Sequence, residues 1–123
     1  MGLDMYLTGE HRFLNDGCDP RQVASERRQL GYWRKHPNLH GFIVREFADG
    51  VDDCQELHLT SKHIRTILRA IEQDQLPSTT GFFFGHSDGR EKPHDRMVFT
   101  TALRWLETTD EVARRRVFYQ ASW

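Results

Sequence analysis

The sequence lacks the features that identify metal-binding cysteine motifs, membrane-spanning helices and strongly basic proteins. It has two cysteines, Cys18 and Cys54, which lie in no paired metal-ligand spacing and leave a single disulfide open without requiring one. No stretch approaches the roughly 18 consecutive apolar residues that a membrane-spanning helix needs. The formal net charge is only −1, so no overall positive charge attracts nucleic acid or a membrane surface. These absences argue against a membrane partner and against general nucleic-acid binding, and they leave a local basic patch open.

Two further absences concern location and cofactors. The first residues, Met1 to Leu7, carry no basic segment and place Asp4 in a short apolar run, so they do not form a signal peptide. We therefore expect a cytoplasmic protein. No glycine-rich phosphate-binding turn follows a strand, and the usual two-plus-two metal-ligand spacing is missing. We accordingly predict neither a cofactor nor a bound metal.

The sequence does contain short stretches with clear periodicity. Leu3, Met5 and Leu7 alternate with polar residues, which predicts a half-buried first strand. Further strands are predicted at residues 29–33, 54–59 and 114–123. Residues 9–26 hold three turn signals and are predicted to form a loop, in which one short helix is an alternative.

The most conspicuous apolar run is Phe82–Phe84, enclosed by Gly81 and Gly85. A short aromatic run bounded by turn residues is typical of a buried strand. We therefore predict a central strand here. Alternation along that strand would place Phe82 and Phe84 on one face and Phe83 on the other.

Apolar residues at helical spacing predict three helices. The clearest pattern is Ile64, Ile67, Leu68 and Ile71, which follows a Thr60-Ser61 pair able to cap the first turn. The other two helices are predicted from about residue 37 to 48 and from about 94 to 107.

This order of elements predicts a single α+β domain. We expect a small sheet of four or five strands, mostly antiparallel or mixed, with about three helices packed mainly on one face. A doubly wound parallel sheet fits less well, because the strands are short and several alternate cleanly. At 123 residues the chain is long enough for one domain and short for two.

Several segments occur together and in order along the whole chain. They are the opening Met-Gly-Leu-Asp-Met-Tyr-Leu, Tyr32-Trp33-Arg34-Lys35, Leu76-Pro77 ahead of Gly81–Gly85, and the closing Tyr119-Gln120-Ala121-Ser122-Trp123. This combination resembles a family of small uncharacterised proteins encoded by tailed bacteriophages and prophages. The resemblance implies a phage or prophage product made in a bacterial cytoplasm, and it implies no activity.

Seven histidines raise the question of a metal site. His36 and His40 are four residues apart at a predicted helix start, which would place both on one face. A carboxylate or Cys54 would have to complete such a site. The alternative is that His36 precedes the helix and His40 is an ordinary surface residue, and this alternative is favoured.

Two polar segments invite a catalytic interpretation. The loop from His86 to Asp95 holds a base, a hydroxyl and a carboxylate within a short span. Members of a Ser-His-Asp triad normally come from separate elements, so a polar turn explains this loop better. Asp52 and Asp53 could bind a cation or act as an acid–base pair, or they could simply solvate a turn.

The segment Tyr32-Trp33-Arg34-Lys35 combines aromatic rings with a guanidinium, which suits stacking or the anchoring of a partner. In the alternative, Tyr32 and Trp33 belong to the core and Arg34 pairs with a carboxylate. The triplet Arg114-Arg115-Arg116 could hold a phosphate or protect a strand edge. A helix-free sheet face would carry a mixed set of side chains, namely Asp4, Tyr6, Glu56, His58, Phe83, Phe118 and Gln120.

These observations favour binding over catalysis. We expect an accessory protein that binds a host macromolecule, such as a host protein, or that self-associates to a homo-oligomer. The alternative is a small-molecule-binding protein or small enzyme with a site around Trp33, Arg34, His36, His40 and Asp53. The complete set of candidate binding residues is Tyr6, Tyr32, Trp33, Arg34, His36, His40, Asp53, His58, Phe83, His86 and Tyr119.

Overall fold

A computed structural model describes residues 2–13, 25–81, 84–108 and 113–123. Its elements are β1 (Asp4–Phe13), β2 (Ser25–Arg34), α1 (Pro37–Phe47), β3 (Leu57–Leu59), α2 (Ser61–Glu72), α3 (Lys92–Glu107) and β4 (Ala113–Ser122). The strands form one sheet in the order β2-β1-β4-β3, and every neighbouring pair is antiparallel. The α+β class is thus confirmed, and of the two sheet types expected the antiparallel one is present.

The alternation of the first strand sets which face of the sheet is buried. Leu3, Met5 and Leu7 are fully buried. Met5 lies opposite Trp33 of β2, and Leu7 lies opposite Tyr119 of β4. Directly opposed residues share a face, so these side chains form one apolar layer. The intervening positions of β1 point to the other face of the sheet.

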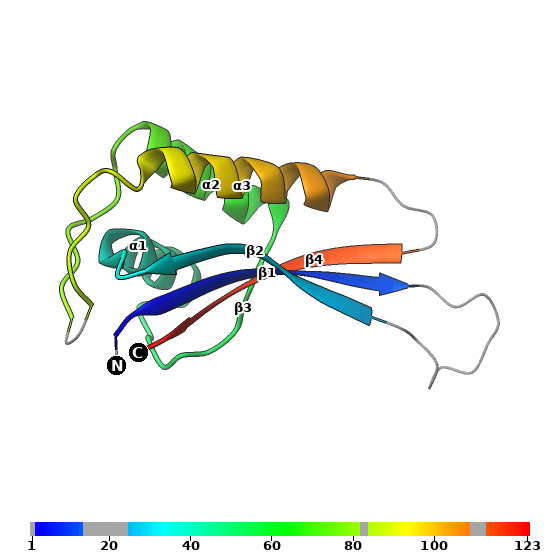
Figure 1. Ribbon diagram of the computed structural model, residues 1–123, viewed down its shortest axis with the longest axis horizontal. Helices are drawn as coiled ribbons and strands as arrows, with labels where there is room; N and C mark the ends of the chain where they lie inside the picture. Colours follow the sequence, from blue (N-terminus) through cyan, green and yellow to red (C-terminus); the bar gives the residue numbers. More distant parts are fainter. Residues whose placement is uncertain (1, 14–24, 82–83, 109–112) are drawn as a thin grey trace.

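The helices pack on that apolar layer. Figure 1 shows α2 and α3 side by side over one face of the sheet, with α1 on the same side near the two chain termini. The predicted stripe of α2 is confirmed, since Ile64, Ile67 and Ile71 are buried. Thr60 caps the helix by accepting a bond from the backbone N–H of His63. None of the described helices covers the opposite face.

The hairpin strands are longer than the sequence predicts. Strand β1 extends to residue 13 and β2 begins at residue 25, so the predicted loop is wrong at residues 9–13 and 25–26, and residues 14–24 lie outside the described part. Ion pairs join the strands at this end, because Glu10 bonds to Arg27 and Arg116 from the two flanking strands, and His11 contacts the Trp105 ring. Gly9 allows the close approach of Trp105, whose ring would lie 2.8 Å from a Cβ.

The predicted central strand at residues 81–85 is wrong for the residues that are described. Gly81, Phe84 and Gly85 belong to no strand, while Phe82 and Phe83 lie outside the described residues. The backbone N–H of Phe84 donates back to the carbonyl of Gly81 over 3.1 Å, which is a turn-like bond. Phe84 is nevertheless buried, with 8% exposed. It fills the core from a loop instead of from a strand.

Two further boundaries differ from the prediction. Of the strand predicted at 54–59, only Leu57–Leu59 is formed, because Cys54 has a left-handed φ of 62° that ends any extended run. Gly41, which weakens α1 by about 1 kcal/mol relative to alanine, has a packing role. A Cβ there would lie 2.1 Å from Thr79 Oγ1, so glycine lets the segment after α2 approach the helix.

Candidate functional site

His36 lies at the junction between β2 and α1, in the interior of the protein. Its side chain is buried, with 3% exposed. Pro37 occupies the first helical position, and His36 makes no side-chain bond to the helix it precedes. Lys35 has a left-handed φ of 56°, so the chain turns sharply between strand and helix. Both ring nitrogens of His36 bond to side chains from other elements.

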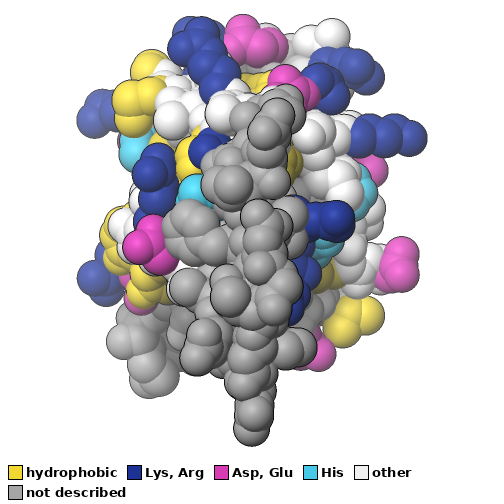
Figure 2. All heavy atoms as spheres, turned by 90° about the vertical axis from the view of Figure 1, so that its right-hand side faces the viewer, with side chains coloured by type: hydrophobic (Ala, Val, Ile, Leu, Met, Phe, Trp, Pro, Cys, Tyr) yellow, Lys and Arg dark blue, Asp and Glu magenta, His cyan; other side chains and the backbone are white. Residues whose placement is uncertain are grey.

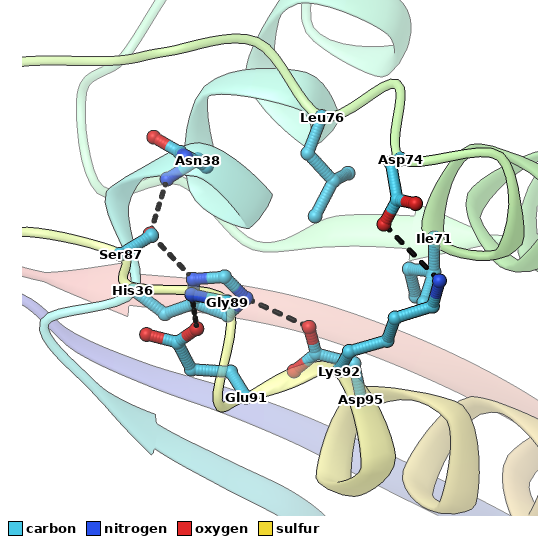
Figure 3. Close-up of a pocket in the computed structure, with 10 residues that line it drawn as sticks. All are labelled: His36, Asn38, Ile71, Asp74, Leu76, Ser87, Gly89, Glu91, Lys92 and Asp95. Atoms are coloured by element: carbon cyan, nitrogen blue, oxygen red, sulfur yellow. Dashed lines mark hydrogen bonds and ion pairs between the residues drawn. The ribbon is translucent and has the colours of Figure 1, made fainter.

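His36 joins Ser87 and Asp95, which come from separate elements (Figure 3). Its Nδ1 lies 2.6 Å from Ser87 Oγ, in the loop before α3, and its Nε2 lies 2.8 Å from Asp95 Oδ2, in the first turn of α3. Trp33 Nε1 donates to the second oxygen of Asp95 over 2.7 Å. Asp95 is 1% exposed and Trp33 is 4% exposed. We call Ser87, His36, Asp95 and Trp33 the His36 network.

The surrounding donors fix where the protons of this network lie. The backbone N–H of Asn38 donates to Ser87 Oγ over 3.1 Å, so the hydroxyl proton of Ser87 is available for His36 Nδ1. Asp95 Oδ2 acts as the acceptor in the bond with His36, so Nε2 of His36 carries the ring proton. This tautomer is assigned from the hydrogen bonds. Serine, base and carboxylate therefore stand in the order that an activated serine nucleophile requires.

A small pocket of about 200 Å³ borders the His36 network. Ser87 and Asn38 line it together with Ile71 and Leu76, which supply an apolar wall (Figure 3). Lys92 lines it as well and bonds to Asp74 over 3.1 Å. Pockets for drug-sized ligands usually measure about 300–1,000 Å³, so this one admits only a small group.

His40 forms a second network one helical turn further along α1. Its Nδ1 lies 2.6 Å from the Tyr119 hydroxyl, and its Nε2 lies 2.9 Å from Asp52 Oδ2. Trp123 Nε1 donates to the other oxygen of Asp52 over 3.2 Å. We call Tyr119, His40, Asp52 and Trp123 the His40 network. Both networks thus place a histidine between a hydroxyl and a carboxylate that also accepts from an indole.

The two networks differ in their exposure to solvent. Asp95 is almost wholly buried, whereas the side chain of Asp52 is 27% exposed. Asp52 and His40 border a wider depression of about 340 Å³ that Thr79, Thr80 and Phe84 also line. Tyr119, which supplies the hydroxyl of the His40 network, is 1% exposed. The His40 network therefore offers a buried phenol, which is a poor nucleophile while protonated, and the His36 network offers a half-buried serine.

The Tyr119 hydroxyl predicts a pH effect on stability. Burial, together with the Asp52 carboxylate, raises the pKa of Tyr119 well above its ordinary value of 10.0. Above about pH 10 the unfolded chain loses this proton while the folded chain retains it, so stability falls as the pH rises, by about 1.4 kcal/mol per unit. We expect Tyr119→Phe to remove this part of the alkaline loss, as urea denaturation between about pH 9 and pH 11 would measure. A free energy of unfolding that falls equally with pH in the two proteins would contradict this prediction.

Most of the other predicted site residues lie on the helix-free side of the sheet. We define the open face as Asp4, Tyr6, Thr8, Glu10, Arg12, Arg27, Tyr32, Arg34, Glu56, His58, Arg114, Arg116, Phe118 and Gln120, where Glu56 is included because it pairs with Arg27. Tyr32 is 39% exposed and donates its hydroxyl to Asp4 over 2.6 Å. The hydrogen bond from Arg116 to Glu10 holds the pKa of that carboxyl below its ordinary value. The expected surface of mixed aromatic and polar groups is present among the described residues.

The structure separates the predicted site residues into groups. Trp33 and His36 join the first network, while His40 and Tyr119 join the second. Asp53 and His86 are exposed and belong to neither network, and Phe83 lies outside the described residues. The structure therefore divides Trp33, Arg34, His36, His40 and Asp53 between two hydrogen-bond networks and the protein surface. The alternative that Tyr32 and Trp33 both belong to the core is confirmed for Trp33, which is buried, and is wrong for Tyr32, which is exposed.

The sequence pattern did not predict three of the hydrogen-bond partners of His36 and His40. Asp95 and Ser87 were noted within one loop, but their base is His36 and not the adjacent His86. Asp52, rather than Asp53, bonds to His40. The available signal was the four-residue spacing of the two histidines, which does place both at the start of α1.

Metal sites and membrane spans in the described residues, and known proteins, offer no second guide to the chemistry of this chain. No three His, Cys, Asp or Glu side chains of the described part come together as metal ligands, and Cys54 is a free thiol. No helix in the described ranges is long and apolar enough to cross a membrane. No family model, curated protein or solved structure matches the chain. The geometry of the His36 network is therefore the main guide to chemistry.

Proposed function

We propose that this protein is a small serine-dependent hydrolase of short acyl esters. One observation carries the proposal, namely that Ser87 Oγ lies 2.6 Å from His36 Nδ1 while Asp95 Oδ2 lies 2.8 Å from His36 Nε2. Ser-His-Asp constellations recur on unrelated folds and are recognised by geometry and roles. In the usual triad Nε2 faces the serine and Nδ1 faces the carboxylate. In this protein Nδ1 faces the serine and Nε2 faces the carboxylate. One nitrogen can still accept the serine proton, and the other can still donate to the carboxylate.

The reaction follows from the proton positions. Ser87 Oγ attacks the ester carbonyl carbon as its proton passes to His36 Nδ1, and the same proton leaves with the alcohol when the C–OR bond breaks. Water then attacks the acyl-serine and gives its proton to His36. Ser87 regains that proton as the carboxylic acid departs, so the net reaction is ester plus water to acid plus alcohol. Asp95 stabilises the imidazolium that forms in each step.

The N-terminus of α1 favours negative charge on Ser87 Oγ as its proton leaves. The backbone N–H of Asn38, in the first turn of α1, donates to Ser87 Oγ. A helix N-terminus carries a partial positive charge that favours an anion. The apolar wall of Ile71 and Leu76 suits an acyl chain of a few carbons, because the pocket holds only about 200 Å³.

A fluorophosphonate probe tests the proposal, since it labels only serines that a neighbouring base activates. We expect labelling at Ser87, located by peptide mass mapping, and slower labelling when a short-chain p-nitrophenyl ester competes. Ser87→Ala should abolish the label, with Ser61→Ala as the matched control because Ser61 begins α2 away from the pocket. Labelling that is absent, or that persists in Ser87→Ala, would overturn it.

A second function rests on the open face. We propose that the protein also binds a macromolecule in the cytoplasm of a bacterial host, as the phage-family resemblance implies. The supporting observation is that aromatic and charged side chains of β1, β2 and β4 remain without a covering helix among the described residues. An affinity pull-down from bacterial lysate should recover a partner, and Tyr32→Ala should reduce its yield. Recovery of the protein alone, as a monomer, would contradict this function.

A further inference from the structure

The open face carries aromatic rings on its two central strands. Tyr6 lies on β1 and Phe118 on β4. Each has a second ring beside it, since Tyr6 and Tyr32 have centroids 5.3 Å apart and His58 and Phe118 have centroids 5.4 Å apart. Thr8 lies opposite Phe118, and Tyr6 lies opposite Gln120, so the two ring pairs are diagonal neighbours on one surface. They form a platform of π-faces rather than a closed apolar core.

Arginines surround this platform. The open face holds five of them, Arg12, Arg27, Arg34, Arg114 and Arg116, against the three carboxylates of Asp4, Glu10 and Glu56, the last of which bonds to Arg27 over 2.9 Å. Glu10 is itself 7% exposed and bonds to both Arg27 and Arg116. The guanidiniums of these two arginines also lie over the Phe118 ring, at 5.1 and 5.5 Å from its centroid. Positive charge and ring faces therefore occupy the same area.

Acidic residues elsewhere in the sequence offset these arginines, so a chain with a net charge of −1 can carry such a surface. Figure 2 views the molecule from the end where β1 stops and β2 and β4 begin, and dark-blue Lys and Arg side chains lie on both of its flanks with acidic ones among them. On the strands, Arg12 pairs in register with Arg114. Like charges directly opposed on adjacent strands are destabilising. An anionic partner that neutralises both would remove this repulsion.

We propose that the open face binds single-stranded nucleic acid, with bases stacked on Tyr32 and Tyr6 and phosphates held by the surrounding arginines. Non-specific single-strand binders combine a positively charged surface with aromatic platforms, because every base has a π-face. A four-stranded sheet that stacks bases on its central strands, with helices behind, is also how one common RNA-binding module works. That parallel is one of architecture alone. The inference deepens the second proposed function and is independent of the serine chemistry.

Fluorescence anisotropy with labelled 12-nucleotide probes of mixed sequence tests the inference. One arm uses single-stranded RNA, one single-stranded DNA and one a DNA duplex of the same sequence. We expect saturable binding of a single strand, weaker binding of the duplex, and an affinity that falls as salt rises. The RNA and DNA arms distinguish which strand the face prefers.

Variants locate the binding on the open face. Tyr32→Ala should weaken binding by roughly 5- to 150-fold, as the loss of one stacked base predicts. Arg114→Ala should weaken it and reduce the salt slope by about one. The matched controls are Met97→Ala and Arg90→Ala, which replace exposed side chains outside this face, and both should bind as the wild type does.

Three results would overturn the inference. They are an absence of single-strand binding at 50 mM salt, an equal loss in Arg90→Ala and Arg114→Ala, and a dimer formed through the open face that no oligonucleotide dissociates. Circular dichroism spectra of the variants show that a loss is not caused by unfolding. A host protein recovered in the pull-down without any oligonucleotide binding would reject this inference and leave the second proposed function standing. Labelling of Ser87 reports separately on the hydrolase.

Discussion

Replacing Asp95 with asparagine is expected to lower the rate at which Ser87 is acylated by about 10⁴-fold while the chain stays folded. Asparagine retains an oxygen that can accept from Trp33 Nε1, so the indole keeps its partner. Its amide nitrogen, however, donates where the carboxylate accepted. His36 Nε2 then has to accept, and the ring proton moves to Nδ1, which faces Ser87. The imidazole can no longer take the serine proton.

First-order labelling by the fluorophosphonate probe measures this rate. Asp52→Asn is the matched control, because the same change in the His40 network should leave the labelling rate within about twofold of wild type. Urea denaturation of both variants shows whether the fold is intact. An Asp95→Asn protein that is folded and labels at the wild-type rate would show that the carboxylate has no part in activating Ser87.

Replacing Asp95 with alanine is expected to cost the fold about 3–5 kcal/mol. The carboxylate is 1% exposed and accepts from two buried donors, Trp33 Nε1 and His36 Nε2. Alanine leaves both donors without a partner, and each unsatisfied group costs about 1–3 kcal/mol. Since whole domains are stable by only about 5–15 kcal/mol, the variant should be near the limit of folding. The urea midpoint, followed by near-ultraviolet circular dichroism, measures the loss.

Asp52→Ala provides the comparison for this loss. Asp52 likewise accepts from an indole and a histidine, but its side chain is 27% exposed. Water can replace the lost acceptor, so the expected cost is about 1 kcal/mol. Equal losses in the two alanine variants would mean that burial does not govern these networks. A larger loss at Asp52 would identify the His40 network as the main structural one.

The apolar periodicity predicted much of the fold. Alternation in Leu3, Met5 and Leu7 and the helical stripe of α2 identified the two layers that form the core. The polar ends of β1 and β2 carried no such signal, because ion pairs such as Glu10 with Arg27 hold them. The strand predicted at the aromatic run near Phe84 is wrong for a different reason. Its propensity for strand was strong, but tertiary packing placed Phe84 beside His40 from a loop.

The candidate site was predictable only in part. Four-residue spacing placed His36 and His40 on adjacent turns, and their burial could not be read from that spacing. Their partners lie far away in the chain, since Asp95 is 59 residues from His36 and Tyr119 is 79 residues from His40. Local patterns in a sequence do not report such pairs. For that reason the sequence pattern associates Ser87 and Asp95 with the neighbouring His86 instead of with His36.

The pairing of β1 with β4 has a consequence for how the chain folds as it is made. These central strands come from opposite ends of the sequence, and Asp4 lies opposite Ser122. During synthesis β1 can pair only with β2 until the residues of β4 have left the ribosome. Pairing over such a sequence separation is slow, and an incomplete chain exposes apolar surface that promotes aggregation. A chain that stops before β4 therefore lacks the middle of its sheet and not merely its end.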